Sequence, residues 1–502
     1  MKKSEAISAA RESRGDALMH QTDLKLSKSL TIWEVVGISI ALMAPSMAAN
    51  INPQGPASVV GTAVPLAFFI AAIGVALVSY GFIRLSQSFN HAGSVYGLVG
   101  KTLGARSGVV AGWGLLGTYT FYSVVSTMAT GVFGSALLKQ LGIVSEPGVA
   151  LPFIIGGLGL VAIVALAVNS VKRGTRLLLL VEGLTVALIL LTVIVVLIKL
   201  LTGNAPNGET FTMSVFTIPA GADFSTVFLG VVFGFLSFAG FEAAATMGEE
   251  ANTPRRDIPK AMLGVVIFGG IYFTIVTAVE VMGFGANAEG MKNFVGSGSL
   301  LGDLGKAYVG DWLGIIITLG VTISAMGCLL ACVVGAARML FALSRDAEFA
   351  MFSKVSAKTK VPTTAVYWVA GAVVVFTIAW RLMFNAGAFD VFVGSGVIGT
   401  LILLIVYGMT TIGAIKFLFF SGKQRVPRYE IIIPLLGLTM VGYTFFRNVW
   451  PLPTTGAGQG YDVVTIAWLL IGVIAVLVAP KLTKKMGDKM NADENLIETD
   501  VQ

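Results

Sequence analysis

Two carboxyl groups lie inside segments that are otherwise apolar enough to cross a membrane. Glu242 follows Gly240 in the run FGFLSFAGFEAAATM, and Glu182 lies in the run RLLLLVEGLTVALILL. A charge in the apolar core of a bilayer costs several kcal/mol unless it faces protein or water. A carboxyl group in such a low-dielectric setting can gain and lose a proton near neutral pH. The chemistry that these residues suggest is proton binding within a membrane.

The backbone beside Glu242 can also take part in chemistry. Gly234 and Gly240 weaken the helix where N–H and carbonyl groups could leave the helical ladder and face a ligand. The first apolar segment, residues 31–50, is interrupted at a similar depth by Pro45, which removes a helix donor. Freed N–H groups favour a carboxylate, and freed carbonyls favour an ammonium group. The two breaks predict a site for a zwitterionic small molecule, and a purely structural kink at each is the alternative.

The composition is that of a membrane protein. Of the 502 residues, 55% are hydrophobic and 12% are charged, which is more apolar surface than a soluble domain can bury. Cys328 and Cys332 lie four apart in an apolar run, a spacing that fits one helix face and neither a disulfide nor a metal site. With two histidines in the chain, we expect no enzyme, metal centre or cofactor. The sequence shows no repeated selectivity filter and no charged ring of the kind that a channel would need. The net charge of +7 is not taken as a sign of nucleic-acid binding.

Twelve apolar segments are long enough for a bilayer core of about 30 Å, which takes about 20 helical residues. If the N-terminus is cytoplasmic, all but six of the 34 basic residues fall in segments on the same side, in agreement with the positive-inside rule. We therefore expect an all-α integral membrane protein of the cytoplasmic (inner) membrane, with both termini in the cytoplasm. The segments are 31–50, 63–85, 108–138, 150–169, 176–201, 224–248, 260–284, 311–343, 363–384, 390–415, 430–449 and 462–480.

The two interruptions fall in the first and sixth segments. Broken helices at corresponding positions of two halves are the sequence sign of an inverted-repeat transporter and of its binding site. We expect the LeuT-type arrangement, in which two five-helix repeats enter the membrane from opposite sides. The expected parts are a cytoplasmic tail (1–30), the first repeat (31–201), an extracellular loop (202–223), the second repeat (224–421), two additional helices (422–481) and a second cytoplasmic tail (482–502).

Four stretches in order resemble the amino acid–polyamine–organocation permeases. FAGFEAAATMGEEANTPRRDIPKAM, at 238–262, is similar to the family's sixth span, in which F-x-G-F-E precedes E-E, N-P, R-x-I-P and A. NHAGSVYGLVGKTLGARSGVVAGW, at 90–113, resembles the stretch after its second span, and 323–349 resembles its eighth span and exit. Gly399, Thr400, Leu401 and Tyr407 fit its tenth span.

The resemblance covers about residues 28–420 and implies a secondary active transporter that moves amino acids by alternating access. A polyamine or amine permease, or an amino acid exchanger of the same fold, is the alternative. Expected partners are a small-molecule substrate and membrane lipid, and the protein would be a monomer or a homodimer.

The substrate is expected at the two breaks. Its carboxylate would meet N–H groups of the first break, and its ammonium would meet carbonyls near Leu236 and Ala239. Phe235 and Phe238 are candidate aromatic gates, for which packing is the alternative. The predicted substrate-binding residues are Met43, Ala44, Pro45, Ser46, Met47, Tyr119, Phe235, Leu236, Phe238, Ala239 and Gly240.

Two positions differ from the family's pattern. The family usually has G-S-G at the first break, where this chain has Pro45, Ser46 and Met47. Some proton-coupled relatives carry a lysine in the fifth span, and Thr185 aligns with it here.

Because that lysine is absent, carboxyl groups are the predicted proton carriers. Glu182, one turn before Thr185, is placed ahead of Glu242, for which bracing the broken helix is the alternative. Coupling to H⁺ is favoured over Na⁺, which would need first-span carbonyls and hydroxyls such as those of Thr322 and Ser324 in span eight.

Overall fold

The computed structural model describes residues 31–89, 95–169, 172–247, 251–356, 359, 361–422, 425–451 and 457–493. In these ranges the chain forms helices and no strand. Twelve helical segments are long and apolar enough to cross a membrane, so the expected all-α membrane architecture with twelve spans is confirmed. The expected tail at 1–30 lies outside the described residues, as do His91, Glu249 and Glu250, which belong to two of the family-like stretches.

The first and sixth spans are each divided in the middle, and each of the other ten contains one long helix that is continuous within the described residues. The divided spans are the first, α2 (Ile32–Met43) with α3 (Pro45–Ile51), and the sixth, α10 (Phe224–Phe238) with the 3₁₀ helix η3 (Phe241–Met247). The others are α5 (Val64–Ser88), α7 (Ala105–Gln140), α8 (Ala150–Val168), α9 (Lys172–Thr202), α11 (Pro254–Phe284), α14 (Asp311–Asp346), α15 (Thr363–Phe384), α16 (Ala388–Phe419), α17 (Ile432–Val449) and α18 (Ala457–Val478).

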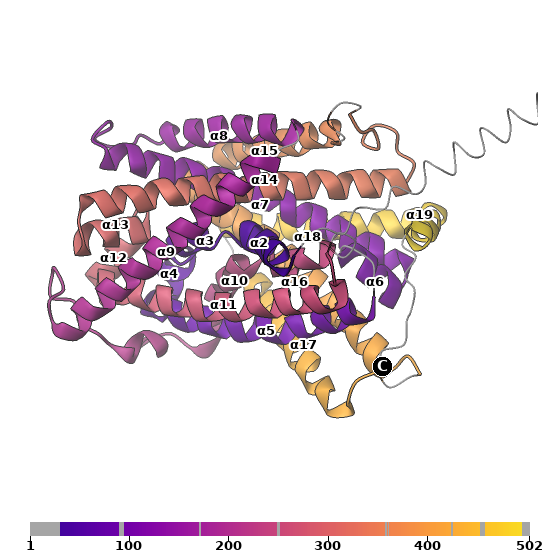
Figure 1. Ribbon diagram of the computed structural model, residues 1–502, viewed down its shortest axis with the longest axis horizontal. Coiled ribbons are helices and arrows are strands. Elements are labelled where there is room, and N and C mark those ends of the chain that lie inside the picture. The colour runs from indigo at the N-terminus through magenta and orange to yellow at the C-terminus, as the bar shows by residue number, and fades with distance from the viewer. Residues whose placement is uncertain are drawn as a thin grey trace, which may run out of the picture.

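The long helices run along the long axis of the molecule and surround the two divided spans (Figure 1). The second span packs along the seventh (α5 with α11), and the third packs along the eighth (α7 with α14). Helices α8, α9 and α15 present rows of exposed leucine, isoleucine and valine side chains, as helices that face lipid do. The polar side chains at the breaks of the first and sixth spans are enclosed by the inner helices.

Short helices cover both ends of the bundle. At one end, α4 (Gln54–Val60), α12 (Ala288–Gly296) and α13 (Leu300–Tyr308) lie near the loop between α9 and α10 (Figure 1). At the other end lie α6 (Val95–Leu103) and α19 (Pro480–Asp493). The expected second cytoplasmic tail, 482–502, is helical up to residue 493.

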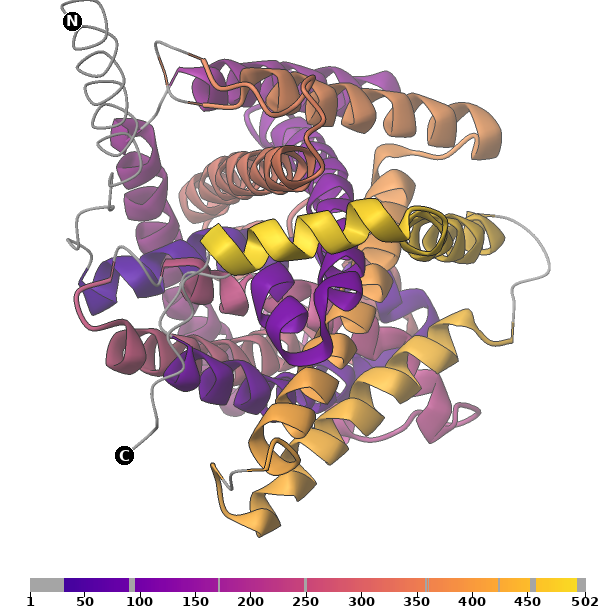
Figure 2. The same ribbon diagram turned by 90° about the vertical axis from the view of Figure 1, so that its right-hand side faces the viewer.

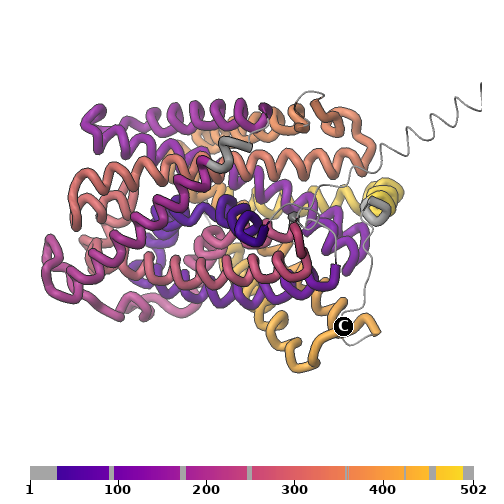
Figure 3. Tube along the Cα trace, in the orientation of Figure 1, coloured from indigo at the N-terminus to yellow at the C-terminus, as the bar shows by residue number. Residues whose placement is uncertain are grey.

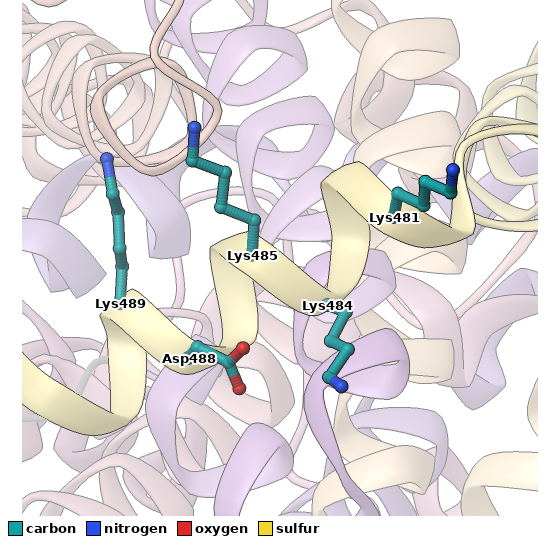
Figure 4. A pocket seen from close by; sticks show the side chains of 5 residues that line it. All are labelled: Lys481, Lys484, Lys485, Asp488 and Lys489. Carbon is teal, nitrogen blue, oxygen red and sulfur yellow. The ribbon is translucent and has the colours of Figure 1, made fainter.

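Helix α19 lies across the end of the bundle, over α7 and α14 (Figure 2). It approaches α7 closely, because a Cβ atom added at Gly487 would lie 2.0 Å from the Cβ of Ala105. Lys485 and Lys489 pair with Glu348, which follows α14, and the Lys489 pair measures 2.7 Å. Figure 4 shows these two lysines on one side of α19, in an open surface hollow that Lys481, Lys484 and Asp488 also line.

Candidate functional site

The first span breaks at one residue, in the middle of the bundle. Ala44 adopts a left-handed conformation (φ 42°, ψ 62°) between α2 and α3, a backbone region that residues other than glycine rarely visit. Pro45 then occupies the first position of α3, where its missing N–H costs nothing and its fixed φ suits a helix start. The trace in Figure 3 shows α2 nearly end-on at the centre of the molecule.

The first N–H groups of α3 are bound to side chains from two other spans. The Ser46 N–H donates to Glu182 Oε1 of α9 at 2.9 Å, and the Met47 N–H donates to Ser324 Oγ of α14 at 3.2 Å. Glu182 is buried, and a hydrogen bond from an N–H to a carboxylate is stronger than one to a neutral acceptor. One donor expected for a substrate carboxylate, the Ser46 N–H, is therefore held in this conformation by a carboxyl group of the protein.

Carbonyl groups on both sides of the same break also accept hydrogen bonds from other spans. The Cys328 thiol donates to the Leu42 carbonyl at 3.4 Å, and the Tyr272 hydroxyl donates to the Pro45 carbonyl at 3.4 Å. Cys328 and Cys332 are unpaired and lie on one face of α14 with their sulfur atoms 3.9 Å apart, as the four-residue spacing indicates. Three spans, α9, α11 and α14, thus contribute side chains to the polar groups of one break.

The second break lies between Phe238 and Phe241. Ala239 is extended at ψ 128°, and Gly240 has φ 109°, a value that favours glycine. Glu242 Oε2 accepts from the Gly240 N–H at 3.1 Å and from the Tyr407 hydroxyl of α16 at 2.8 Å. Glu242 therefore makes the contacts expected of a brace for the broken helix, while its predicted role in proton coupling stays a prediction.

The two breaks are joined directly. Ser39 Oγ of α2 donates to the Phe241 carbonyl at 3.2 Å and accepts from the Ala244 N–H at 3.0 Å. Gly240 lies against the end of α2, since an added Cβ would be 2.9 Å from Leu42 Cβ. The glycine thus permits close contact between spans one and six; open space for a substrate beside its Cα is not seen in this conformation.

The aromatic gate candidates of the sixth span are fully buried. An added Cβ at Gly74 of α5 would meet the Phe235 ring at 2.9 Å. The Phe238 ring packs edge to face on Phe273 of α11, with centroids 5.3 Å apart. Both rings make packing contacts in this conformation, and their gating role stays a prediction beside the packing alternative. The Leu236 carbonyl, an expected ammonium ligand, accepts the Ala239 N–H at 3.3 Å.

Of the remaining candidates, Tyr119 and Thr185 line helix contacts with α14. The Tyr119 ring lies beside Gly335, where an added Cβ would be 3.4 Å away. Thr185 donates to the Val181 carbonyl of its own helix at 2.7 Å and packs against Gly320. Met43 lies at the end of α2, where its sulfur approaches Gly269 of α11.

One buried carboxyl group was missed at the sequence level. Glu280 lies in α11, is fully buried, and neither of its carboxyl oxygens has a hydrogen-bond partner among the described residues. It stands in the apolar run VTAVEVMGF, and an acidic residue within a span is a signal by itself.

Fold and site together define a polytopic membrane protein that encloses a polar site at two helix breaks. The chain belongs to the amino acid permease family, because the family model described as "Amino acid permease" matches residues 35–450. The resemblance to the amino acid–polyamine–organocation permeases is thereby confirmed.

Among the relatives are two branched-chain amino acid permeases and a putrescine importer. The chain is 25% identical to the branched-chain amino acid permease BcaP of Bacillus subtilis over 61% of this chain and 65% of that protein. It is also 25% identical to BcaP of Lactococcus lactis over 66% of this chain and 71% of that protein. The low-affinity putrescine importer PlaP of Escherichia coli is 23% identical over 91% of this chain and 95% of its own length. The alignment thus spans slightly less than two thirds of the Bacillus permease.

Proposed function

We propose that this protein is a secondary active transporter that imports amino acids across the cytoplasmic membrane by alternating access, driven by protons. Family membership and two branched-chain amino acid permeases among the relatives support the kind of substrate. The distribution of basic residues supports cytoplasmic termini. The pairing of α5 with α11 and of α7 with α14 supports two inverted repeats, at 31–201 and 224–421.

The contact between the Ser46 N–H and Glu182 carries the proposal for coupling. Two charged carboxylates cannot share these few donors at close range, because like charges repel strongly in a low-dielectric site. A substrate carboxylate can take the Ser46 N–H once Glu182 has bound a proton and lost its charge. Proton and substrate then bind together, so that each inward step carries both, and either ligand strengthens binding of the other by the same factor.

The second break supplies the other half of the substrate site. Its carbonyl groups near Leu236 and Ala239 are the proposed ligands of the substrate ammonium, since the backbone leaves the helix there. The Leu236 carbonyl accepts a local N–H in the present conformation, so substrate binding would include a small rearrangement of this turn. Glu242 holds the turn through the Gly240 N–H.

Purified protein in proteoliposomes tests the proposal. Uptake of radiolabelled amino acids is measured first with an inward proton gradient in sodium-free buffer, and then with a sodium gradient at constant pH. We expect accumulation with the proton gradient alone. Accumulation driven only by sodium would refute proton coupling and would favour a sodium site near Ser324, whose hydroxyl already contacts the first break.

An amine or polyamine permease is the second candidate, favoured by the PlaP match over most of both chains and by the two carboxyl groups at the breaks. A substrate without a carboxylate would pair its ammonium with charged Glu182 instead of displacing it. Its affinity would therefore rise with pH, whereas the affinity for an amino acid would fall. Binding of putrescine and of amino acids, compared at two pH values, separates the candidates by the sign of the change.

A further inference from the structure

Glu280 is the most isolated carboxyl group of the described chain. Its side chain is fully buried in α11, and no described group donates a hydrogen bond to either oxygen. Burying a charged carboxylate without a partner costs several kcal/mol. The neutral acid is therefore the form that these surroundings favour, and the charged form would be short-lived.

On α11, Glu280 lies between the part that contacts the second helix break and the part that contacts α13 at the end of the bundle. A stripe of α11 at helical spacing comprises Gly269, Tyr272, Val276, Glu280 and Gly283. At its inner end, an added Cβ at Gly269 would lie 2.8 Å from the Phe238 ring of the second break. At its outer end, an added Cβ at Gly283 would lie 3.0 Å from Leu304 of α13.

Tyrosine hydroxyl groups lie on both sides of Glu280 along α11. The Tyr272 hydroxyl, about two turns before Glu280 on the same face of α11, donates to the Pro45 carbonyl of the first break at 3.4 Å. One turn beyond Glu280, the Gly283 carbonyl accepts from the Tyr308 hydroxyl at 3.1 Å, and the same hydroxyl contacts Glu209 of the outer loop at 3.4 Å.

No described charged group on the elements around α11 makes a hydrogen bond to Glu280. Lys199 of α9 donates to the Tyr308 carbonyl at 2.6 Å, and Asp303 of α13 accepts from Ser297 at 2.6 Å. Helices α3 and α10 carry no charged residue, α5 carries its only one, Arg84, at the opposite end, and the short 3₁₀ helix at 213–216 has none. Among the residues whose side chains the structure describes, the other charged groups on elements that pack against α11 are Glu34 of α2, Glu182 of α9, Glu242 of η3, Glu289 and Lys292 of α12, and Lys306 of α13, which pairs with Asp311.

We propose that Glu280 is a second proton-binding group of the transport cycle, which takes up a proton from the outer side and passes it toward Glu182. The Glu280 O–H bond breaks, its proton is transferred by way of the Tyr272 hydroxyl, and the Glu182 carboxylate becomes the neutral acid. The unpartnered Glu280 carboxylate then regains a proton from outside. This inference rests on the proposed proton coupling at Glu182 and names the route by which that proton enters.

The test compares net uptake with exchange in proteoliposomes. Glu280→Gln keeps the shape of the neutral acid but cannot release a proton, and Glu280→Asp is the conservative variant. Glu289→Gln, an exposed acid on α12, is the matched control. Uptake driven by an inward proton gradient is measured beside counterflow of the same substrate, which needs no net proton release.

For Glu280→Gln we expect proton-driven uptake to fall at least about tenfold, with counterflow within about twofold of wild type and partial recovery in Glu280→Asp. The control should match wild type in both assays. Proton-driven uptake at the wild-type rate in Glu280→Gln would overturn the proposal, and so would an equal loss of both activities. If wild-type protein itself ignores the proton gradient, the proposed coupling fails instead, and this is seen before any variant is compared.

A second measurement applies to the wild-type protein and does not depend on how the variants fold. Dicyclohexylcarbodiimide reacts with protonated carboxyl groups in apolar surroundings, and mass spectrometry of peptides locates the product. We expect Glu280 to be modified in proteoliposomes, with less product as the outside pH is raised. Absence of modification, or modification independent of outside pH, would contradict uptake of a proton from that side.

Discussion

Replacement of Gly240 by alanine probes the contact between the two broken spans. In the structure, Gly240 has φ 109°, and an added Cβ would lie 2.9 Å from Leu42 Cβ and 3.0 Å from the Met43 backbone N. A carbon atom cannot approach this closely without displacing the end of α2. The backbone N of Met43 is part of the first break, so the displacement would reach Ala44 and the N–H donors of α3.

The size of the effect follows from two contributions. Holding a residue with a side chain at positive φ costs about 1–2 kcal/mol, and overpacking a tight contact costs about 1–3 kcal/mol. Together they disfavour the present conformation by about 2–5 kcal/mol, which corresponds to about 30-fold or more in its population at about 1.4 kcal/mol per factor of ten. Gly240→Val would cost more, because its branched side chain meets the same atoms.

Two assays on Gly240→Ala measure this effect. We expect a lower midpoint of thermal inactivation in detergent and a transport rate reduced by at least about tenfold. Gly264→Ala of α11 is the control, because no atom lies within 4 Å of the added Cβ there. A Gly240→Ala protein with wild-type stability and transport would refute the argument that these spans need glycine at their contact.

Two further changes follow from contacts of the described residues. Tyr407→Phe removes the 2.8 Å hydrogen bond to buried Glu242, so we expect a loss of about 1–3 kcal/mol, visible as a lower thermal-inactivation midpoint; an unchanged midpoint would show that the brace is dispensable. Hydrogen bonds from Lys485, and then from Lys489, lower the pKa of Glu348 to about 2. The Glu348 carboxylate therefore stabilises the docking of α19 at pH values above its pKa in the unfolded chain, which is about 4.3. This stabilisation is lost as the pH falls through about 2. Pepsin should therefore cleave α19 slowly at pH ~4 and faster at pH ~2 in wild type, and fast at both in Glu348→Gln; equal protection of both proteins at pH ~4 would contradict this.

The spans and both breaks could be predicted from the sequence because their causes are local. Apolar length decides where a helix crosses the bilayer. Pro45 cannot continue the preceding helix, and the structure places the left-handed residue directly before it, at Ala44. Gly240 tolerates the positive φ that the second break requires.

The partners of the freed backbone groups could not be predicted, because they come from distant parts of the chain. Ser46 and Glu182 are 136 residues apart, and Met47 and Ser324 are 277 apart. Only the packing of α9 and α14 against α3 brings them together. The sequence therefore indicated Glu182 as an acid within a span, but gave no sign that it takes a donor expected for the substrate.

The short helices at the bundle ends were missed for a different reason. Helices α12 and α13 are nine residues each, too short for a span and without the length that makes a periodic pattern distinctive. Their position is fixed by contacts with distant residues, such as the Leu301 N–H that donates to Asn50 Oδ1 of α3 at 2.9 Å. The same limit applies to α19, whose lysines resemble those of a solvated tail.

Substrate binding as a function of pH tests the central claim most directly. Binding of an amino acid that the transporter accepts is measured with purified wild-type protein and with Glu182→Gln. For wild type, the dissociation constant should rise about tenfold per pH unit once Glu182 must be protonated for binding, and for Glu182→Gln it should be independent of pH. An unchanged pH slope in Glu182→Gln would contradict the account, because the proton that accompanies the substrate would then be bound elsewhere.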